Sequence, residues 1–254
     1  KKFQIRTQLR FKTSHYTIIG ITETTNITIA MASPASDETN DTTITVYGFL
    51  LGDTPNGDLT PFGTKLLTFL KMSKTDYKYV GFLEHNGSGS PKGKMPWIHA
   101  PGLLGDDNIG DSSMIIKALV KADPTKYDFD SHLSAQDKAI GLAMKTMIEE
   151  STYWGIVHMR WNTEEFSTVT VPMYFPGYHW SAQKLIGWYL GRSVNAQLKG
   201  QGTGLLTDEE ITTKANAEIL ALSEFLGTKK YLMGSQITSY DATLYAFLFG
   251  IIKG

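Results

Sequence analysis

The chain has 254 residues, a formal net charge of −1 at pH 7 and a hydrophobic fraction of 41%. That length and that fraction are enough to bury one or two sizeable cores, and we expect two. The near-zero net charge gives no global signal for nucleic acid or for an anionic membrane, and we expect no nucleic-acid partner. The chain has no cysteine, which excludes disulfides, thiolate zinc sites and cysteine nucleophiles and is compatible with a reducing compartment.

Residues 1–41 differ from the rest of the chain. They do not begin with Met, and five basic residues precede the first acidic residue, Glu23. A basic, acid-poor, threonine-containing start is typical of a mitochondrial transit peptide. The alternative is that Met31 is the true start and residues 1–30 are an upstream artefact. In both cases, the polar, turn-rich stretch that follows is expected to be a disordered lead-in.

The first predicted domain covers residues 42–122 and begins with a strand. Residues 44–51 (ITVYGFLL) are β-branched and aromatic, as in a strand, and the following GDTPNGDL must be a loop. Thr60 and Pro61 then have the residue types of a helix N-cap and first helical position. Residues 77–82 (YKYVGF) predict a second strand. Strand, helix and strand in this order favour a βαβ unit with a parallel pair.

The second half of this domain combines a proline with a helix start. Met95–Pro96 comes directly before the strand-like WIHA, and a proline can begin a strand. An X–Pro bond in this position is a candidate for the cis form, which would turn the N–H and C=O of Met95 outward for a ligand. Asp111 and Ser112 open an apolar-periodic helix, whose N-terminus would accept a carboxylate. We therefore predict a site for a small peptide-like anion here.

The remainder of the chain predicts helices. Residues 123–133 contain Pro124 and clustered Asp, so we expect a linker there. A second, all-helical domain should cover 134–254, with capping boxes at Ser134, Thr207 and Thr238. The apolar run that ends at Gly254 is shorter than the roughly twenty residues that span a bilayer. Separately, we expect the domain to be truncated at Gly254.

Five segments carry a resemblance to a known family. They read TPFGTKLLTFLKMS at 60–73, SPKGKMPWI at 90–98, IGDSSMIIKAL at 109–119, EESTYWGIVHMRW at 149–161 and SQITSYDATLYAFL at 235–248. From about Thr42 onward the chain resembles the glutathione S-transferase superfamily. Its sequence is similar to that of the branch of metaxins and "failed axon connections" proteins. The resemblance implies an α/β thioredoxin-like N-terminal domain followed by an all-α C-terminal domain.

The resemblance also implies a binding site for glutathione. Met95 and Pro96, the latter cis, would hold the peptide main chain, and Asp111 with Ser112 would hold the γ-glutamyl end, although a helix cap alone also explains this pair. Lys94 and Lys92 border the same loop and could pair with a glycine-end carboxylate, although an ordinary solvated loop also explains them. Glutathione is thus the implied substrate or ligand, and no metal is implied.

The catalytic position of the superfamily departs from its pattern in this chain. The start of the first helix carries a Ser, Cys or Tyr that lowers the pKa of the glutathione sulfur, and here Thr60 keeps a hydroxyl. Gly63 stands where the related branch has a cysteine. Helix capping alone also accounts for Thr60. Tyr47 on the first strand is the second candidate, with packing as its alternative.

Two functions follow from the resemblance. The first is conjugation of glutathione to an apolar electrophile, which would lie in a cleft that Tyr153 and His158 reach. The second is a non-catalytic interaction module of the metaxin or Fax type, with a protein partner. We expect a cytoplasmic protein, with a mitochondrial location as the alternative, and the superfamily also allows a homodimer. Dehalogenase or isomerase chemistry on the same scaffold is a third reading, because fold does not fix function.

Overall fold

The computed structural model describes residues 11–13, 16–18, 43–49, 57–162, 166 and 168–253. The predicted leader, the lead-in and the end of the strand expected at 44–51 lie wholly or largely outside these residues. By contacts, the chain divides into two compact units. The unit that contains residues 43–139 and 237–253 is called the sheet unit below. The unit that contains 140–236 is called the helical unit.

The sheet unit contains one four-stranded sheet in the order β4-β3-β5-β6. Its elements are β3 (Ile44–Tyr47), α1 (Pro61–Met72), β4 (Tyr77–Val80), α2 (Phe82–His85), β5 (Trp97–Ala100), α3 (Pro101–Leu104), β6 (Gly105–Gly110), α4 (Ser112–Ala122), α5 (Pro124–Tyr127) and α11 (Ser239–Lys253). Strands β3 and β4 are parallel, and the β3–β5 and β5–β6 pairs are antiparallel. The predicted βαβ unit and thioredoxin-like layer are therefore confirmed.

The core of this unit lies on one face of the sheet. Because side chains alternate along a strand, Ile44 and Val46 of β3 face the core together with Ile98 of β5. Helices α1 and α4 cover this face with their apolar residues, and Leu66 and Ile115 are fully buried. The opposite face carries larger aromatic side chains, which are described below.

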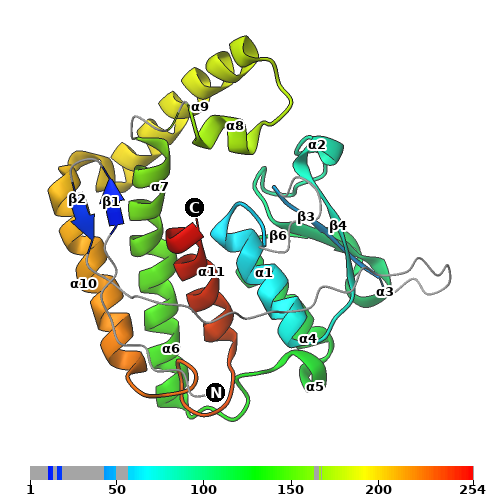
Figure 1. Ribbon diagram of the computed structural model, residues 1–254. Coiled ribbons are helices and arrows are strands. Elements are labelled where there is room, and N and C mark those ends of the chain that lie inside the picture. Colours follow the sequence, from blue (N-terminus) through cyan, green and yellow to red (C-terminus); the bar gives the residue numbers. More distant parts are fainter. Residues whose placement is uncertain are drawn as a thin grey trace. The chain divides into compact units, whose positions relative to one another are not determined.

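Helix α11 packs along α1, within the sheet unit (Figure 1). Ala242 belongs to the same core as the sheet, and the Phe247 ring meets the Phe62 ring edge to face at 5.2 Å between centroids. The Thr238 hydroxyl and N–H both donate to the Asp241 carboxylate, at 2.7 and 2.8 Å. This matches the predicted cap. By contacts, the helix groups with the sheet rather than with the helices that precede it. The predicted second domain, 134–254, placed it with those helices instead.

The helical unit follows the predicted pattern, with one irregularity. Helix α6 (Ala135–Met147) runs into it, and the remaining elements are β1 (Phe11–Thr13), β2 (Tyr16–Ile18), a π-helical turn (Ile148–Thr152), α7 (Tyr153–Trp161), α8 (Thr170–Tyr174), α9 (Trp180–Gln201), a 3-10 turn (Thr203–Leu205) and α10 (Asp208–Leu226). The π-helical turn thus interrupts the helical stretch from Ala135 to Trp161. Among the described residues, no helix has the length and apolar character needed to cross a membrane.

Candidate functional site

The Met95–Pro96 peptide bond is cis, as expected. Pro96 is buried directly before β5, and its carbonyl accepts a hydrogen bond from the N–H of Asp111 at 3.2 Å. That bond brings the two predicted halves of the site together. Neither the N–H nor the C=O of Met95 has a hydrogen-bond partner among the described residues. Met95 therefore offers one main-chain donor and one acceptor beside the start of α4.

The N-terminus of α4 combines a cap with an unsatisfied hydroxyl. Asp111 has φ = +79°, in a region that favours glycine, and its carboxylate accepts from the N–H groups of Ser113 and Met114 at 2.9 and 3.1 Å. Ser112 is only 2% exposed, yet its Oγ has no hydrogen-bond partner in the described chain. Buried hydroxyls nearly always have one. The Ser112 hydroxyl is therefore an unsatisfied polar group at a positively polarised helix end.

A buried lysine lies under the same helix end. Lys65 on α1 is 1% exposed, and its Nζ donates to the Ser113 Oγ at 2.7 Å. A buried ammonium group is costly unless polar or anionic groups surround it. The hydrogen bond to Ser113 places this positive charge at the first turn of α4. Lys65 was not among the predicted site residues, although a lysine within the apolar face of a predicted helix was a visible signal.

Thr60 is the N-cap of α1, and both functions of its hydroxyl are occupied. The Oγ1 accepts from the N–H of Gly63 at 3.0 Å and donates to the Asp58 Oδ1 at 2.8 Å. Asp58 is 6% exposed and also accepts from the N–H groups of Phe49 and Thr60, at 2.8 and 2.7 Å, and from the Tyr79 hydroxyl. Asp58 is thus the second residue that the sequence analysis missed. Its signal was an Asp two positions before a Thr-Pro helix start.

Asp58 also accounts for Gly63. A Cβ at position 63 would come within 2.3 Å of the Asp58 Cγ and 2.6 Å of its Oδ1. The Asp58 carboxyl therefore fills the space that a side chain at the cysteine-like position would need. The glycine at position 63, where the related branch has a cysteine, is therefore tied to the buried carboxylate of Asp58.

Tyr47 lies on the other face of the sheet, within an aromatic cluster. Its ring stacks on Trp97 at 3.6 Å between centroids, and His85 meets both rings edge-on. His85 accepts from the N–H of Gly87 through Nδ1 at 2.9 Å and lies 3.2 Å from the Gly48 carbonyl through Nε2. This geometry gives Tyr47 a packing role. The Trp97 Nε1 is buried and, like the Ser112 hydroxyl, has no partner in the described chain.

The loop before Met95 is exposed and is closed by a side chain. The Ser90 Oγ donates to the carbonyl of Lys94 at 2.7 Å and accepts from its N–H at 3.0 Å. The Lys92 and Lys94 side chains are exposed on this loop. They therefore border Met95 without a fixed partner of their own in the described residues.

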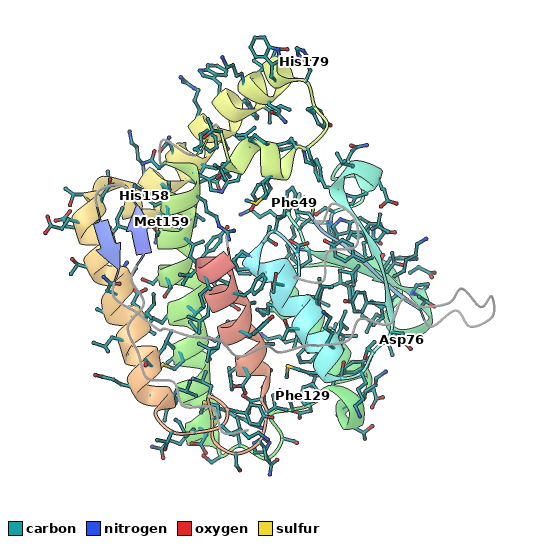
Figure 2. The ribbon with its side chains drawn as sticks, in the orientation of Figure 1. Phe49, Asp76, Phe129, His158, Met159 and His179 are labelled. Atoms are coloured by element: carbon teal, nitrogen blue, oxygen red, sulfur yellow. The ribbon has the colours of Figure 1, made fainter. Side chains whose placement is uncertain are left out.

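Tyr153 and His158 belong to the helical unit, on α7. The His158 ring, labelled in Figure 2, is 7% exposed, and its Nε2 lies 2.8 Å from the Asp208 Oδ1. Burial, with a smaller contribution from Tyr174, raises the pKa of Tyr153 to about 12. Their role toward an apolar co-substrate stays a prediction. The described residues of both units contain no cluster of three or more His, Asp or Glu side chains that could hold a metal ion.

Comparison with known proteins agrees with this geometry. A family model described as "Glutathione S-transferase N-terminal domain" matches residues 61–166, and one described as "Glutathione S-transferase, C-terminal domain" matches residues 215–254. The isoprene-epoxide–glutathione S-transferase of Rhodococcus sp. (strain AD45) is 32% identical over 211 residues, which cover 81% of this chain and 85% of that protein. The chain belongs to the glutathione S-transferase family.

Some relatives of this chain have names that do not mention a transferase. Failed axon connections of Drosophila melanogaster is 27% identical over 209 residues, which cover 75% of this chain but only 46% of that protein. Metaxins are also among the relatives. Among solved structures, a glutathione transferase family member from Pseudomonas fluorescens has a TM-score of 0.53 at 16% identity and covers 84% of this chain and 78% of its own. This likeness confirms the expected glutathione S-transferase fold.

Proposed function

We propose that this transferase-family protein binds glutathione at the N-terminus of α4, beside the cis bond of Met95–Pro96. The unpartnered, buried hydroxyl of Ser112 is the observation that carries this proposal. The α-carboxylate of the γ-glutamyl group would accept from that hydroxyl and from the positively polarised end of the helix. The free N–H and C=O of Met95 would pair with the main chain of the cysteinyl residue, as in a short antiparallel ladder.

The charge distribution supports an anionic ligand. Lys65 places a buried ammonium group on Ser113, in the first turn of α4, and this charge adds to the polarity of the helix end. Asp111 is the one carboxylate at this helix start, and the N–H groups of Ser113 and Met114 neutralise it in part. The positive charge therefore favours a carboxylate at Ser112.

We further propose that the bound thiol is conjugated to an apolar electrophile, and the name of the Rhodococcus relative makes an epoxide the first class to test. The thiol proton leaves to solvent, and the thiolate sulfur attacks a ring carbon. A C–S bond forms as the C–O bond breaks, and the alkoxide oxygen takes a proton from water. Thr60 would turn its hydroxyl from Asp58 to the thiolate and so stabilise the charged form.

One observation favours the alternative, in which the protein is a non-catalytic interaction module of the metaxin or Fax type. The Thr60 hydroxyl already donates to Asp58. A donor that must give up a hydrogen bond to a carboxylate stabilises a thiolate less than a free one does. In this alternative, ligand binding would persist without conjugation, or both would be absent.

Calorimetric titration of glutathione into the full chain tests the binding proposal. We expect saturable binding that Ser112→Ala weakens by about 1–3 kcal/mol, the cost of a lost buried polar partner. Lys65→Met should also weaken it, because the positive charge is removed. Ser131→Ala is the matched control, since Ser131 is an exposed serine of the same unit, and it should leave the affinity unchanged. Cysteinylglycine, which lacks the γ-glutamyl group, should bind much more weakly. No heat from a folded protein would overturn the proposal.

Conjugation is tested separately, with glutathione and a small aliphatic epoxide. We expect Thr60→Val to lower kcat/KM by about 10- to 100-fold, the range for a hydrogen bond to a charged group. Its affinity for glutathione should not change. Thr60→Ser keeps both the cap and the hydroxyl and is the control. Binding without any turnover would favour the interaction module.

A further inference from the structure

Helix α9 presents its large side chains outward and its smallest residues inward. Trp180, Leu185, Trp188 and Tyr189 are 63%, 67%, 62% and 67% exposed. On the inner side, Gly187 lies against Val171 and Phe166, and a Cβ there would come within 3.1 Å of Val171. This pattern is the reverse of a helix that uses its aromatic residues to fill a core.

The outward residues form one continuous surface, which we call the α9 face. Trp180, Lys184, Trp188 and Arg192 follow one another at intervals of four, so they share one side of the helix, with Leu185 and Tyr189 beside them. Three aromatic rings and a leucine at these exposures amount to roughly 400–500 Å² of apolar surface. An apolar patch of that size on a single helix is large enough to be functional.

The charge around this face has a single sign. No Asp or Glu occurs between Glu165 and Asp208, although the chain has 25 acidic residues in total. The helix carries Lys184, Arg192 and Lys199, and all three are exposed. The Lys184 Nζ lies 5.1 Å from the Trp180 ring, and the Arg192 guanidinium lies 5.3 Å from the Trp188 ring. Each cation is therefore held beside an indole.

We propose that the α9 face is a peripheral membrane-binding surface for bilayers that contain anionic lipids. Trp and Tyr prefer the boundary between headgroups and acyl chains, and Lys and Arg can lay their stems on apolar surface while their charges reach the headgroups. A 22-residue helix is about 33 Å long, and it can lie flat on such a surface.

The residues before the helix extend the same surface. Pro176 to Trp180 are all exposed, and they include Tyr178 next to His179, which marks the start of α9 in Figure 2. An exposed loop with a tyrosine and a tryptophan adds an aromatic anchor at the N-terminal end of the helix. The membrane contact therefore runs from Tyr178 to at least Arg192.

Sedimentation of the full chain with lipid vesicles tests this proposal. We expect binding to vesicles of phosphatidylcholine mixed with phosphatidylserine and much weaker binding to phosphatidylcholine alone. Trp188→Ala should reduce the partition coefficient about tenfold through lost apolar burial. Lys184→Gln with Arg192→Gln should reduce it about 30-fold on anionic vesicles, at about 1 kcal/mol for each charge. Tryptophan emission should shift to the blue on binding, and less so in Trp188→Ala.

Two matched controls distinguish binding through the α9 face from non-specific binding to vesicles. Leu220→Ala removes an exposed leucine of α10, and Lys117→Gln with Lys121→Gln removes two exposed lysines of α4. Both should bind vesicles as the parent does. Equal binding by all variants, or no binding by the folded parent, would overturn the proposal. So would a dimer that Trp188→Ala dissociates in the absence of vesicle binding, because the face would then contact a second copy. Glutathione titration of Trp188→Ala should be unchanged, which keeps this test independent of the proposed function.

Discussion

The single residue that most limits the chemistry of this protein is Asp58. Its carboxyl accepts four hydrogen bonds around the start of α1 and occupies the space beside Gly63. A glycine inside a helix normally costs about 0.5–1 kcal/mol relative to alanine. Here that cost is offset because a glycine at position 63 leaves space for the Asp58 carboxyl and its hydrogen bonds.

The effect of Gly63→Ala on stability should therefore depend on residue 58, and should be of opposite sign with and without Asp58. In the parent we expect it to destabilise the fold by about 1–3 kcal/mol, the usual cost of overpacking. In an Asp58→Gly background it should stabilise by about 0.5–1 kcal/mol, since the space is then free. Urea unfolding of the four proteins of the cycle measures the coupling. Gly200→Ala on α9, where a Cβ would meet nothing within 4 Å, is the control; an equal effect of Gly63→Ala in both backgrounds would contradict the steric argument.

Tyr153 gives a residue-scale prediction about pH. Its pKa is raised to about 12, mainly by burial, and an unfolded tyrosine titrates near 10. Between these values the unfolded chain binds fewer protons than the folded one, so stability falls as pH rises from about 10 to 12 and is unaffected below that window. Tyr153→Phe should flatten the alkaline end of a plot of unfolding free energy against pH. Tyr178→Phe, at an exposed site, should follow the parent curve, and an unchanged slope for Tyr153→Phe would refute the assignment.

At the scale of elements, the π-helical turn between α6 and α7 depends on a contact with α10. The hydroxyls of Ser151 and Thr152, both in the turn, donate to the two carboxylate oxygens of Glu218. π-Helical turns are rare and appear mostly as single turns inside α-helices. This one is explained by the carboxylate that both hydroxyls reach.

Glu218→Gln should accordingly lower the unfolding free energy by about 1–2 kcal/mol, because hydrogen bonds to a charged acceptor become bonds to a neutral one. Chemical denaturation is the measurement. Glu224→Gln changes an exposed glutamate of the same helix and should stay within about 0.5 kcal/mol of the parent. Equal losses in the two variants would show that the turn does not depend on Glu218.

Elements with strong local signals could be predicted from the sequence. The Thr60-Pro61 start, the capping boxes at Thr207 and Thr238 and the strands at Tyr77 and Trp97 all appear where local chemistry places them. The π-helical turn could not be predicted, because its partner Glu218 is more than 60 residues away. The same reason hid the occupied hydroxyl of Thr60, since hydrogen bonds to it depend on how the loop around Asp58 folds. Met95, Asp111 and Ser112 could be proposed from the sequence because a proline and a helix cap are visible locally, and their role toward a ligand stays a prediction.

At the scale of the whole molecule, α11 belongs with α1 and the sheet, although it is the last helix described. Elements that share a core open together, so their amides should exchange together. In native-state hydrogen exchange we expect the amides of α11 to follow those of α1 in their dependence on denaturant, and those of α10 to form a separate set. If α11 exchanged with α10 instead, the shared core of Ala242 with Leu66 and Phe69 would not act as a cooperative unit.

The place of α11 also has a consequence for biosynthesis. Domains usually fold in the order in which the ribosome makes them, the N-terminal one first. Here the sheet is translated before residues 140–236, but the helix that packs into its core is translated after them. The inserted helices can therefore fold while the nascent sheet still exposes the apolar side of α1. That side stays open to chaperones until residues 239–253 emerge from the ribosome.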